Sequence, residues 1–396
     1  MTRASDLNPG NLNRGILNTG ILTTGDPSRS VLNTGTAMRF SVDGWDPSYG
    51  ASLETDGLSE STARVNPDVE LPAGRWRPID PGDAEPLPDA LLFVDGVRRE
   101  EARAWIEDAP TVDPLLVDPL LVDPLLVDPL TGEVLAGQPS GTSPTGEPTA
   151  ALCASYAAGV ICCCADGAHL VKAERRYGLF SVARHASDIA TWAATYKAHR
   201  VARRRPGVPV MKALSDALQD ELAAVEKIVA VEARAALAGH LADDAHDLLI
   251  LDGQLRGREH LPRALGYIKS HDATYLPPEL NGLVGALAPG QRTPAFHIGT
   301  KWERHSWYLR LPGPAGAPWS GVVRIECPPD LEVSEVTRLA GLSQRCLGKF
   351  ASAPYKDSRA PQNLYPIAGL ERELRRRLGD PRLLYRALRE AARPQS

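Results

Sequence analysis

Two short apolar segments of this chain end in the same Asp-Gly pair, and they constrain its fold more than any other feature. The segments are Ala90-Leu-Leu-Phe-Val-Asp95-Gly96 and Asp247-Leu-Leu-Ile-Leu-Asp252-Gly253. Apolar runs of this length, closed by a turn pair, are typical of strands that a sheet buries on both faces. Between them, residues 209–239 show the apolar spacing of an amphipathic helix. The sequence therefore predicts an α/β fold around a buried sheet.

Other periodic segments extend this pattern on both sides of the helix. We expect further strands at 152–164, 168–182, 264–269, 306–311 and 321–327. We expect further helices near 277–287, 331–349, 367–378 and 381–392. The predicted architecture is a mixed sheet flanked by helices, with low-complexity insertions.

Two low-complexity stretches interrupt the regular pattern. Residues 1–37 repeat Asn-x-Gly and contain few large apolar side chains, which predicts a disordered extension. Residues 111–130 repeat Val-Asp-Pro-Leu-Leu, and a proline at every fifth position excludes a continuous helix or a central strand. We therefore predict a disordered extension at 1–37, a β-rich segment at 38–89, and a main domain at 90–396 with a disordered insert at 109–149.

The net charge of −5 conceals an uneven distribution of charged residues. Residues 151–396 carry 34 basic and 25 acidic side chains. This part of the chain could therefore present a polyanion-binding surface although the net charge of the whole chain is negative. No apolar run reaches the roughly 18 residues that a membrane span needs. The first residues also lack the apolar stretch of a secretory signal. These observations predict a cytoplasmic protein with no membrane partner.

The six cysteines do not form a recognisable framework. Cys162, Cys163 and Cys164 are consecutive within an apolar run, which predicts a buried strand, and no pair has CxxC spacing. We expect reduced thiols and no zinc site.

Asp95 and Asp252 are the first candidates for chemistry, because α/β sheets place their sites at the carboxyl ends of strands. Either Asp-Gly pair alone is equally explained by a turn. The helix at 209–239 is expected to supply a third carboxylate. Glu232 falls on its apolar stripe at 100° per residue, and Glu221 lies within about 20° of the stripe, so direction does not choose between them. If the helix returns antiparallel to the second strand, Asp252 lies level with about residue 228, which favours Glu232.

Three carboxylates would form a hard oxygen site suited to Mn²⁺ or Mg²⁺. Such a site polarises a phosphoryl oxygen and activates water. Basic side chains that could contact phosphate follow both acids, although each alone is equally well a solvated surface charge. These candidates for nucleic-acid contact are Arg98, Arg99, Arg256, Arg258 and Lys269.

The order strand–Asp, two strands, helix–Glu, strand–Asp resembles the ribonuclease-H-like nuclease fold. Within that superfamily, four segments resemble NurA-domain nucleases, and the resemblance spans roughly residues 90–370. The segments are FVDGVRR at 93–99, LLILDGQL at 248–255, GYIKSHDATYL at 266–276 and VVRIECP at 322–328.

This resemblance implies a manganese-dependent DNA nuclease that processes DNA ends in double-strand-break repair. It also implies a homodimer that works with a HerA-type hexameric ATPase. Asp95, Glu232 and Asp252 would then hold the metal, with Lys269 positioning phosphate in the catalytic site. The family often has a further histidine ligand near its C-terminus, but residues 360–365 contain none, which leaves Asn363 as the candidate oxygen ligand.

Three functional hypotheses remain open from the sequence. The leading one is a metal-dependent DNA nuclease. The second, which the missing histidine favours, is a non-catalytic nucleic-acid-binding or partner-docking protein on the same fold. The third is an α/β protein whose carboxylates serve only in turns, and it predicts no binding to DNA.

Overall fold

The computed structural model describes residues 59–61, 63–83, 86–107, 148–202, 207–238, 246–271, 273–313 and 319–393. The predicted extension at 1–37 and nearly all of the insert at 109–149 lie outside the described residues. The strands are β1 (Ser59–Glu60), β2 (Arg64–Asn66), β3 (Ala90–Ile106), β4 (Thr149–Cys164), β5 (Gly167–Ser181), β6 (Ile189–Ala190), β7 (Thr195–Arg200), β8 (Asp247–Asp252), β9 (Ala264–Ile268), β10 (Ala273–Thr274), β11 (Phe296–Gly299), β12 (Glu303–Arg310) and β13 (Val322–Cys327). The helices are α1 (Val210–Leu237), α2 (Pro278–Ala286), α3 (Val333–Leu347), α4 (Tyr365–Arg377) and α5 (Pro381–Ala391), with 3₁₀ turns at Ala73–Arg75 and Gly348–Phe350.

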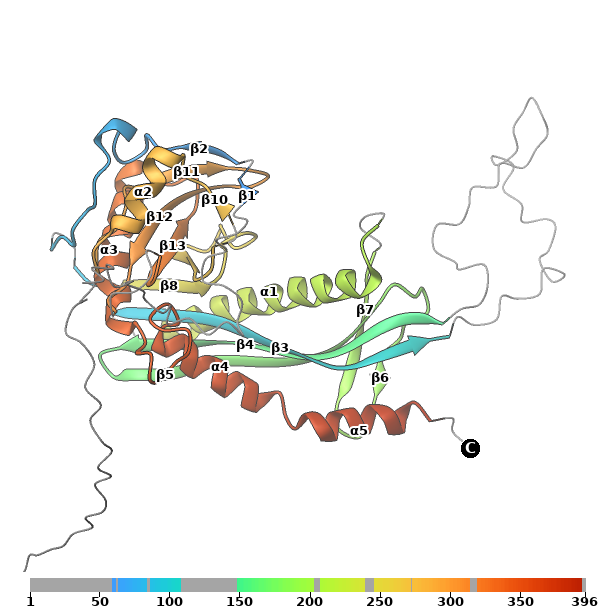
Figure 1. Ribbon diagram of the computed structural model, residues 1–396. Coiled ribbons are helices and arrows are strands. Elements are labelled where there is room, and N and C mark those ends of the chain that lie inside the picture. Colours follow the sequence, from blue (N-terminus) through green and yellow to red (C-terminus); the bar gives the residue numbers. More distant parts are fainter. Residues whose placement is uncertain are drawn as a thin grey trace, which may run out of the picture. The chain divides into compact units, whose positions relative to one another are not determined.

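The protein is a mixed α/β protein built on one large mixed sheet. Within the described residues the strand order is β2-β11-β12-β13-β9-β8-β3-β4-β5-β7-β6, and β1 and β10 form a separate pair (Figure 1). At the centre, β3, β8 and β9 are parallel neighbours, whereas β3, β4 and β5 are antiparallel neighbours. The strand β3 therefore joins a parallel half of the sheet to an antiparallel half.

Helices cover both faces of this centre. The apolar stripe of α1 packs on one face, against alternate residues of the central strands such as Leu92, Val94 and Leu251. The opposite face, which includes Phe93 and Ile250, is covered by α3 and the start of α4. The rest of α4 continues along the same side of β3 and β4, opposite α1 (Figure 1). Because successive strand residues point to opposite faces, each strand residue faces one helical layer or the other.

The predicted elements agree closely with the structure, with one informative exception. The helix expected at 209–239 is α1, and the strands expected at 152–164 and 168–182 are β4 and β5. The strand expected to end at Asp95 instead continues to Ile106 as β3. Its parallel partner β8 stops at Asp252, but β4 keeps pairing with β3 as far as Ile106, so the chain stays extended.

No helix in the described part of the chain combines the length and the apolar character needed to cross a membrane.

Candidate metal centre

Asp95 and Asp252 lie side by side in the structure. The parallel ladder between β3 and β8 ends at the pair Val94–Leu251, and each aspartate is the next residue of its strand. Both follow residues that face α1, so both side chains lie on the opposite side of the sheet, toward α4. Asp95 is 6% exposed. The expectation that the two aspartates meet at one place on the sheet is confirmed.

The third carboxylate at this place comes from α4. Carboxylate oxygens of Asp95, Asp252 and Glu371 all lie within 4.8 Å of one another. Glu371 is held there by Arg359, whose guanidinium donates to both of its oxygens at 3.0 and 2.6 Å. The three acids thus come from two adjacent strands and from the helix that packs over them. We call this group the carboxylate site.

Asp95 is the electrostatically strained member of the carboxylate site. Its Oδ1 accepts a hydrogen bond from the backbone N–H of Gly96 at 2.7 Å, whereas its Oδ2 is buried and has no hydrogen-bond partner. Burial, followed by repulsion from the Asp252 carboxylate, raises the pKa of Asp95 well above its usual range. Three carboxylates within 4.8 Å of one another, one of them with a buried oxygen that lacks a hydrogen-bond partner, fit a site for a bound cation.

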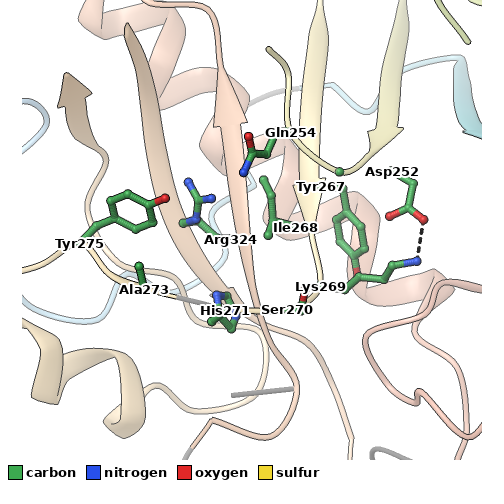
Figure 2. A pocket seen from close by; sticks show the side chains of 11 residues that line it. Asp252, Gln254, Tyr267, Ile268, Lys269, Ser270, His271, Ala273, Tyr275 and Arg324 are labelled. Atoms are coloured by element: carbon green, nitrogen blue, oxygen red, sulfur yellow. Dashed lines mark hydrogen bonds and ion pairs between the residues drawn. The ribbon is translucent and has the colours of Figure 1, made fainter. Parts of the chain in front are cut away.

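Lys269 and Asn363 border the carboxylate site. The Lys269 ammonium lies 2.6 Å from Oδ2 of Asp252 (Figure 2). It also donates to Oδ1 of Asn363 at 3.0 Å. The Asn363 amide nitrogen donates to Asp357 at 2.7 Å, and the residue is fully buried. The oxygen of Asn363, predicted as a metal ligand, therefore accepts a hydrogen bond from Lys269.

The predicted placement of Glu232 on the buried face of α1 is wrong. Its side chain is 46% exposed and lies 2.8 Å from the ammonium of Lys172. The buried stripe is not constant along α1. It rotates by about 80° between the first and second halves of the helix, judged at 100° per residue, and Glu232 falls outside it.

The buried acid of α1 is Glu226, two residues from the level predicted for the third carboxylate. It is 5% exposed and forms an ion pair with Arg258. However, α1 covers the face of the sheet opposite to Asp95, and Glu226 lies against Gly96, where an added Cβ would approach its Oε1 to 2.6 Å. Burial raises the pKa of Glu226 to about 7, although Arg258 opposes this shift. The length argument located the right level of α1, but on the wrong face.

The predicted phosphate-contacting residues differ in how available they are. Arg99 is bound to Glu101 and to the carbonyl of Gly379, and Arg258 is bound to Glu226. Arg98 donates to the Ser215 carbonyl on α1 at 3.1 Å. Lys269 lies at the site, with its ammonium bound to Asp252 and Asn363. Arg256 is exposed and its side chain forms no hydrogen bond or ion pair within the described residues.

A pocket of about 250 Å³ adjoins the carboxylate site. Asp252 and Lys269 lie at one end of it and His271, Tyr275 and Arg324 at the other (Figure 2). The guanidinium of Arg324 stacks over the Tyr275 ring at 4.7 Å. Burial lowers the pKa of His271 to about 4, so this imidazole is neutral near pH 7. The pocket thus offers an aromatic ring, a cation and a neutral imidazole beside the carboxylates.

Glu371 and Arg359 are the site residues that sequence reasoning missed. A usable signal existed, because Glu371 lies four residues after buried Ile367 and three before buried Leu374, on the edge of the apolar stripe of α4. Its neighbour Glu373 forms ion pairs within the helix with Arg376 and Arg377. Glu371 is instead bound by Arg359, which lies outside α4, and only the tertiary structure shows this difference between the two acids.

Comparison with known proteins gives only distant structural likeness. No protein-family model matches the sequence, and no curated protein does either. Among solved structures, the crystal structure of the NurA nuclease from Sulfolobus solfataricus aligns with 80% of this chain and 88% of its own, with 9% sequence identity and a TM-score of 0.38. We base the functional proposal on the residues of this chain, because a likeness at this level carries no argument about activity.

Proposed function

We propose that this protein is a metal-dependent nuclease that hydrolyses phosphodiester bonds at the carboxylate site. The observation that carries the proposal is the convergence of Asp95, Asp252 and Glu371 within 4.8 Å, with a buried Asp95 oxygen that has no hydrogen-bond partner. Three acids at this separation repel one another, and a divalent cation would relieve that repulsion.

The donor set fits Mn²⁺ or Mg²⁺, because carboxylate oxygens are hard ligands. A bound ion of this kind would polarise a phosphoryl oxygen and lower the pKa of a water molecule. Lys269, with Asp252 and Asn363 as its present partners, can turn its ammonium toward a substrate phosphate. Arg359 fixes the direction of Glu371 through its two hydrogen bonds.

The order of the strands also supports the proposal. The order β5-β4-β3-β8-β9 has two antiparallel pairs followed by two parallel pairs, and α1 precedes β8 along the chain. The ribonuclease-H-like resemblance rests on the order strand–Asp, two strands, helix–Glu, strand–Asp. This chain has these elements, with the short strands β6 and β7 added before α1 and with Glu232 of α1 exposed. In this arrangement the two aspartates come from the central pair β3 and β8.

A polyanionic substrate suits the pocket next to the site. Buried Glu326 forms ion pairs with both Arg304 and Arg324, which leaves this group with one excess positive charge beside the pocket. We propose DNA as the substrate. On the sequence resemblance, we further propose that the enzyme processes DNA ends in double-strand-break repair, as a homodimer with a HerA-type hexameric ATPase.

The test is digestion of end-labelled DNA by the full chain with Mn²⁺, Mg²⁺ or EDTA. We expect metal-dependent cleavage, and we expect Asp95→Ala, Asp252→Ala and Glu371→Gln to abolish it. Glu232→Gln is the matched control, because it removes an exposed carboxylate without changing the site, and it should retain wild-type activity. If wild type and Asp252→Ala are equally inert with every divalent ion, the nuclease proposal fails.

One observation favours the rival function, a non-catalytic nucleic-acid-binding or partner-docking protein. The Lys269 ammonium already offsets part of the negative charge at Asp252 without a metal. The rival predicts DNA binding in EDTA that is unchanged by Asp95→Ala and Asp252→Ala, together with no cleavage. DNA binding that weakens steeply as the salt concentration rises would exclude the third hypothesis, an α/β protein whose carboxylates serve only in turns.

A further inference from the structure

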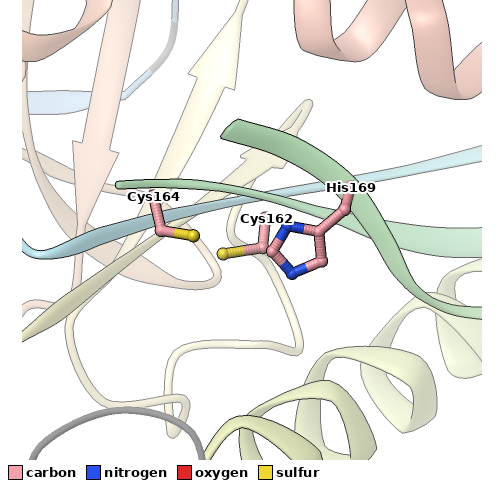
Figure 3. Close-up of side chains that lie close together, drawn as sticks. All are labelled: Cys162, Cys164 and His169. Carbon is pink, nitrogen blue, oxygen red and sulfur yellow. The ribbon is translucent and has the colours of Figure 1, made fainter. Parts of the chain in front are cut away.

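A second cluster of metal-ligating side chains lies on the β4–β5 hairpin, apart from the carboxylate site. The sulfur atoms of Cys162 and Cys164 and a ring nitrogen of His169 all lie within 4.8 Å of one another. Figure 3 shows the two thiols from β4 pointing toward each other, with the imidazole from β5 beside them. Cys162 belongs to the face of the sheet that α1 covers, which is opposite to the face of Asp95.

A β-bulge creates this arrangement. The pairing of β4 with β5 shifts by one residue between Val160 and Ile161, and Val171 has no partner in the ladder. After the shift, Cys162 pairs directly with His169. Without it, Cys162 would pair with Leu170, and the imidazole would point to the other face, because a one-residue slip reverses every side chain.

Contrary to the expectation from the cysteine spacing, we propose that Cys162, Cys164 and His169 bind a zinc ion, with the fourth position taken by water or by the carboxylate of Asp166 in the adjoining turn. Two thiolates and one imidazole are the ligands that Zn²⁺ prefers. Tetrahedral zinc with bonds of about 2.3 Å to sulfur and about 2.0 Å to nitrogen separates such atoms by about 3.5–3.8 Å. Because the three atoms lie within 4.8 Å of one another, closing them onto a zinc ion needs adjustments of at most about 1.3 Å.

The balance of charge favours the metal-bound form at this place. Binding forms two Zn–S bonds and one Zn–N bond and releases the two thiol protons to solvent. The result is neutral at the three side chains, which suits the complete burial of Cys162. Only weak protein contacts are lost, such as the 3.8 Å contact from the Cys164 thiol to the Gly167 carbonyl.

The neighbouring Cys163 provides a matched control. It lies between the two proposed ligands in sequence, but it packs on the opposite face of the sheet. The exposed ligand His169 provides a variant that leaves the apolar core intact. These positions separate loss of the metal from loss of the fold.

The experiment is titration of the reduced full chain with Co²⁺, followed by absorption spectroscopy. We expect sulfur-to-cobalt charge-transfer bands and visible bands of tetrahedral cobalt that saturate at one ion per chain and disappear when Zn²⁺ is added. The carboxylate site contains only oxygen ligands and gives no such charge-transfer band. Cys164→Ser and His169→Ala should weaken binding by more than about 100-fold, since even outer-shell changes cost 10–100-fold. Cys163→Ser should bind like wild type.

Two outcomes would overturn the proposal. One is the absence of sulfur-to-cobalt bands in the wild type. The other is an equal loss of these bands in Cys163→Ser and Cys164→Ser when circular dichroism shows both variants folded. The readout does not depend on nuclease activity, so a failure here leaves the proposed function untouched.

Discussion

The replacement Asp95→Asn should stabilise the protein in the absence of metal while it abolishes stabilisation by metal. Asp95 is buried, its Oδ2 has no partner, and oxygens of two further carboxylates lie within 4.8 Å. At an effective dielectric constant of about 20, two unit charges at that distance repel by about 3.5 kcal/mol. Lys269 and Arg359 offset part of this repulsion. We therefore expect a net gain of about 1–3 kcal/mol in the free energy of unfolding.

The raised pKa of Asp95 in the folded state determines how the free energy of unfolding of the metal-free protein changes with pH. Between the unfolded and the folded pKa, the native state binds more protons, so the stability of the metal-free wild type falls as pH rises through this window. The asparagine side chain that replaces Asp95 does not titrate, and the variant should lose this part of the pH dependence. Its advantage over wild type should therefore be largest above the folded pKa.

The assay is urea denaturation of wild type and Asp95→Asn, in EDTA and in Mn²⁺. Metal at about 100 times its dissociation constant should add about 2.7 kcal/mol to wild type and almost nothing to the variant. Glu232→Gln is the control for simple loss of a negative charge, and as an exposed pair with Lys172 it should change stability by less than about 1 kcal/mol. A destabilised Asp95→Asn in EDTA, or equal stabilisation of both proteins by Mn²⁺, would refute this reasoning.

Three further predictions concern the packing around the site. Gly96→Ala should lower the free energy of unfolding by about 1–3 kcal/mol in urea denaturation, because the new methyl group would lie 2.6 Å from the Glu226 carboxylate. Glu326→Gln should cost about 3–5 kcal/mol by the same measurement, because it leaves the buried cations of Arg304 and Arg324 without their carboxylate, and a cost under 1 kcal/mol would contradict this. Because the pKa of Glu226 is raised to about 7 in the folded state, its ionisation should lower the free energy of unfolding of the wild type as pH rises from about 4.5 to about 7. Glu226→Gln should lose this part of the pH dependence. An equal change of the free energy of unfolding with pH in both proteins, measured by urea denaturation, would count against it.

Local patterns in the sequence were sufficient to predict most helices and strands and the meeting of Asp95 with Asp252. Apolar periodicity identifies strands and helices directly, because the spacing of apolar residues along the chain depends on which faces of the element are buried. Two buried strands that each place an acid after the same apolar run are natural parallel neighbours in an α/β sheet. The fixed rises of helix and strand placed Asp252 level with about residue 228 of α1 and so favoured Glu232, but Glu232 is exposed in the structure.

The identity of the third carboxylate depended on long-range packing. Periodicity defines the apolar stripe of a helix, but not which face of the sheet that helix covers, and α1 packs opposite to Asp95 whereas α4 packs on its side. The position of Glu371 beside the apolar stripe of α4 marks it as a candidate, but only the packing shows that Glu371, and not Glu373, reaches the carboxylate site. The cysteine–histidine cluster has the same origin, because one unpaired residue in β5 brings His169 to the face of Cys162. Faces and registers are set by contacts between distant segments, and a linear sequence does not display them.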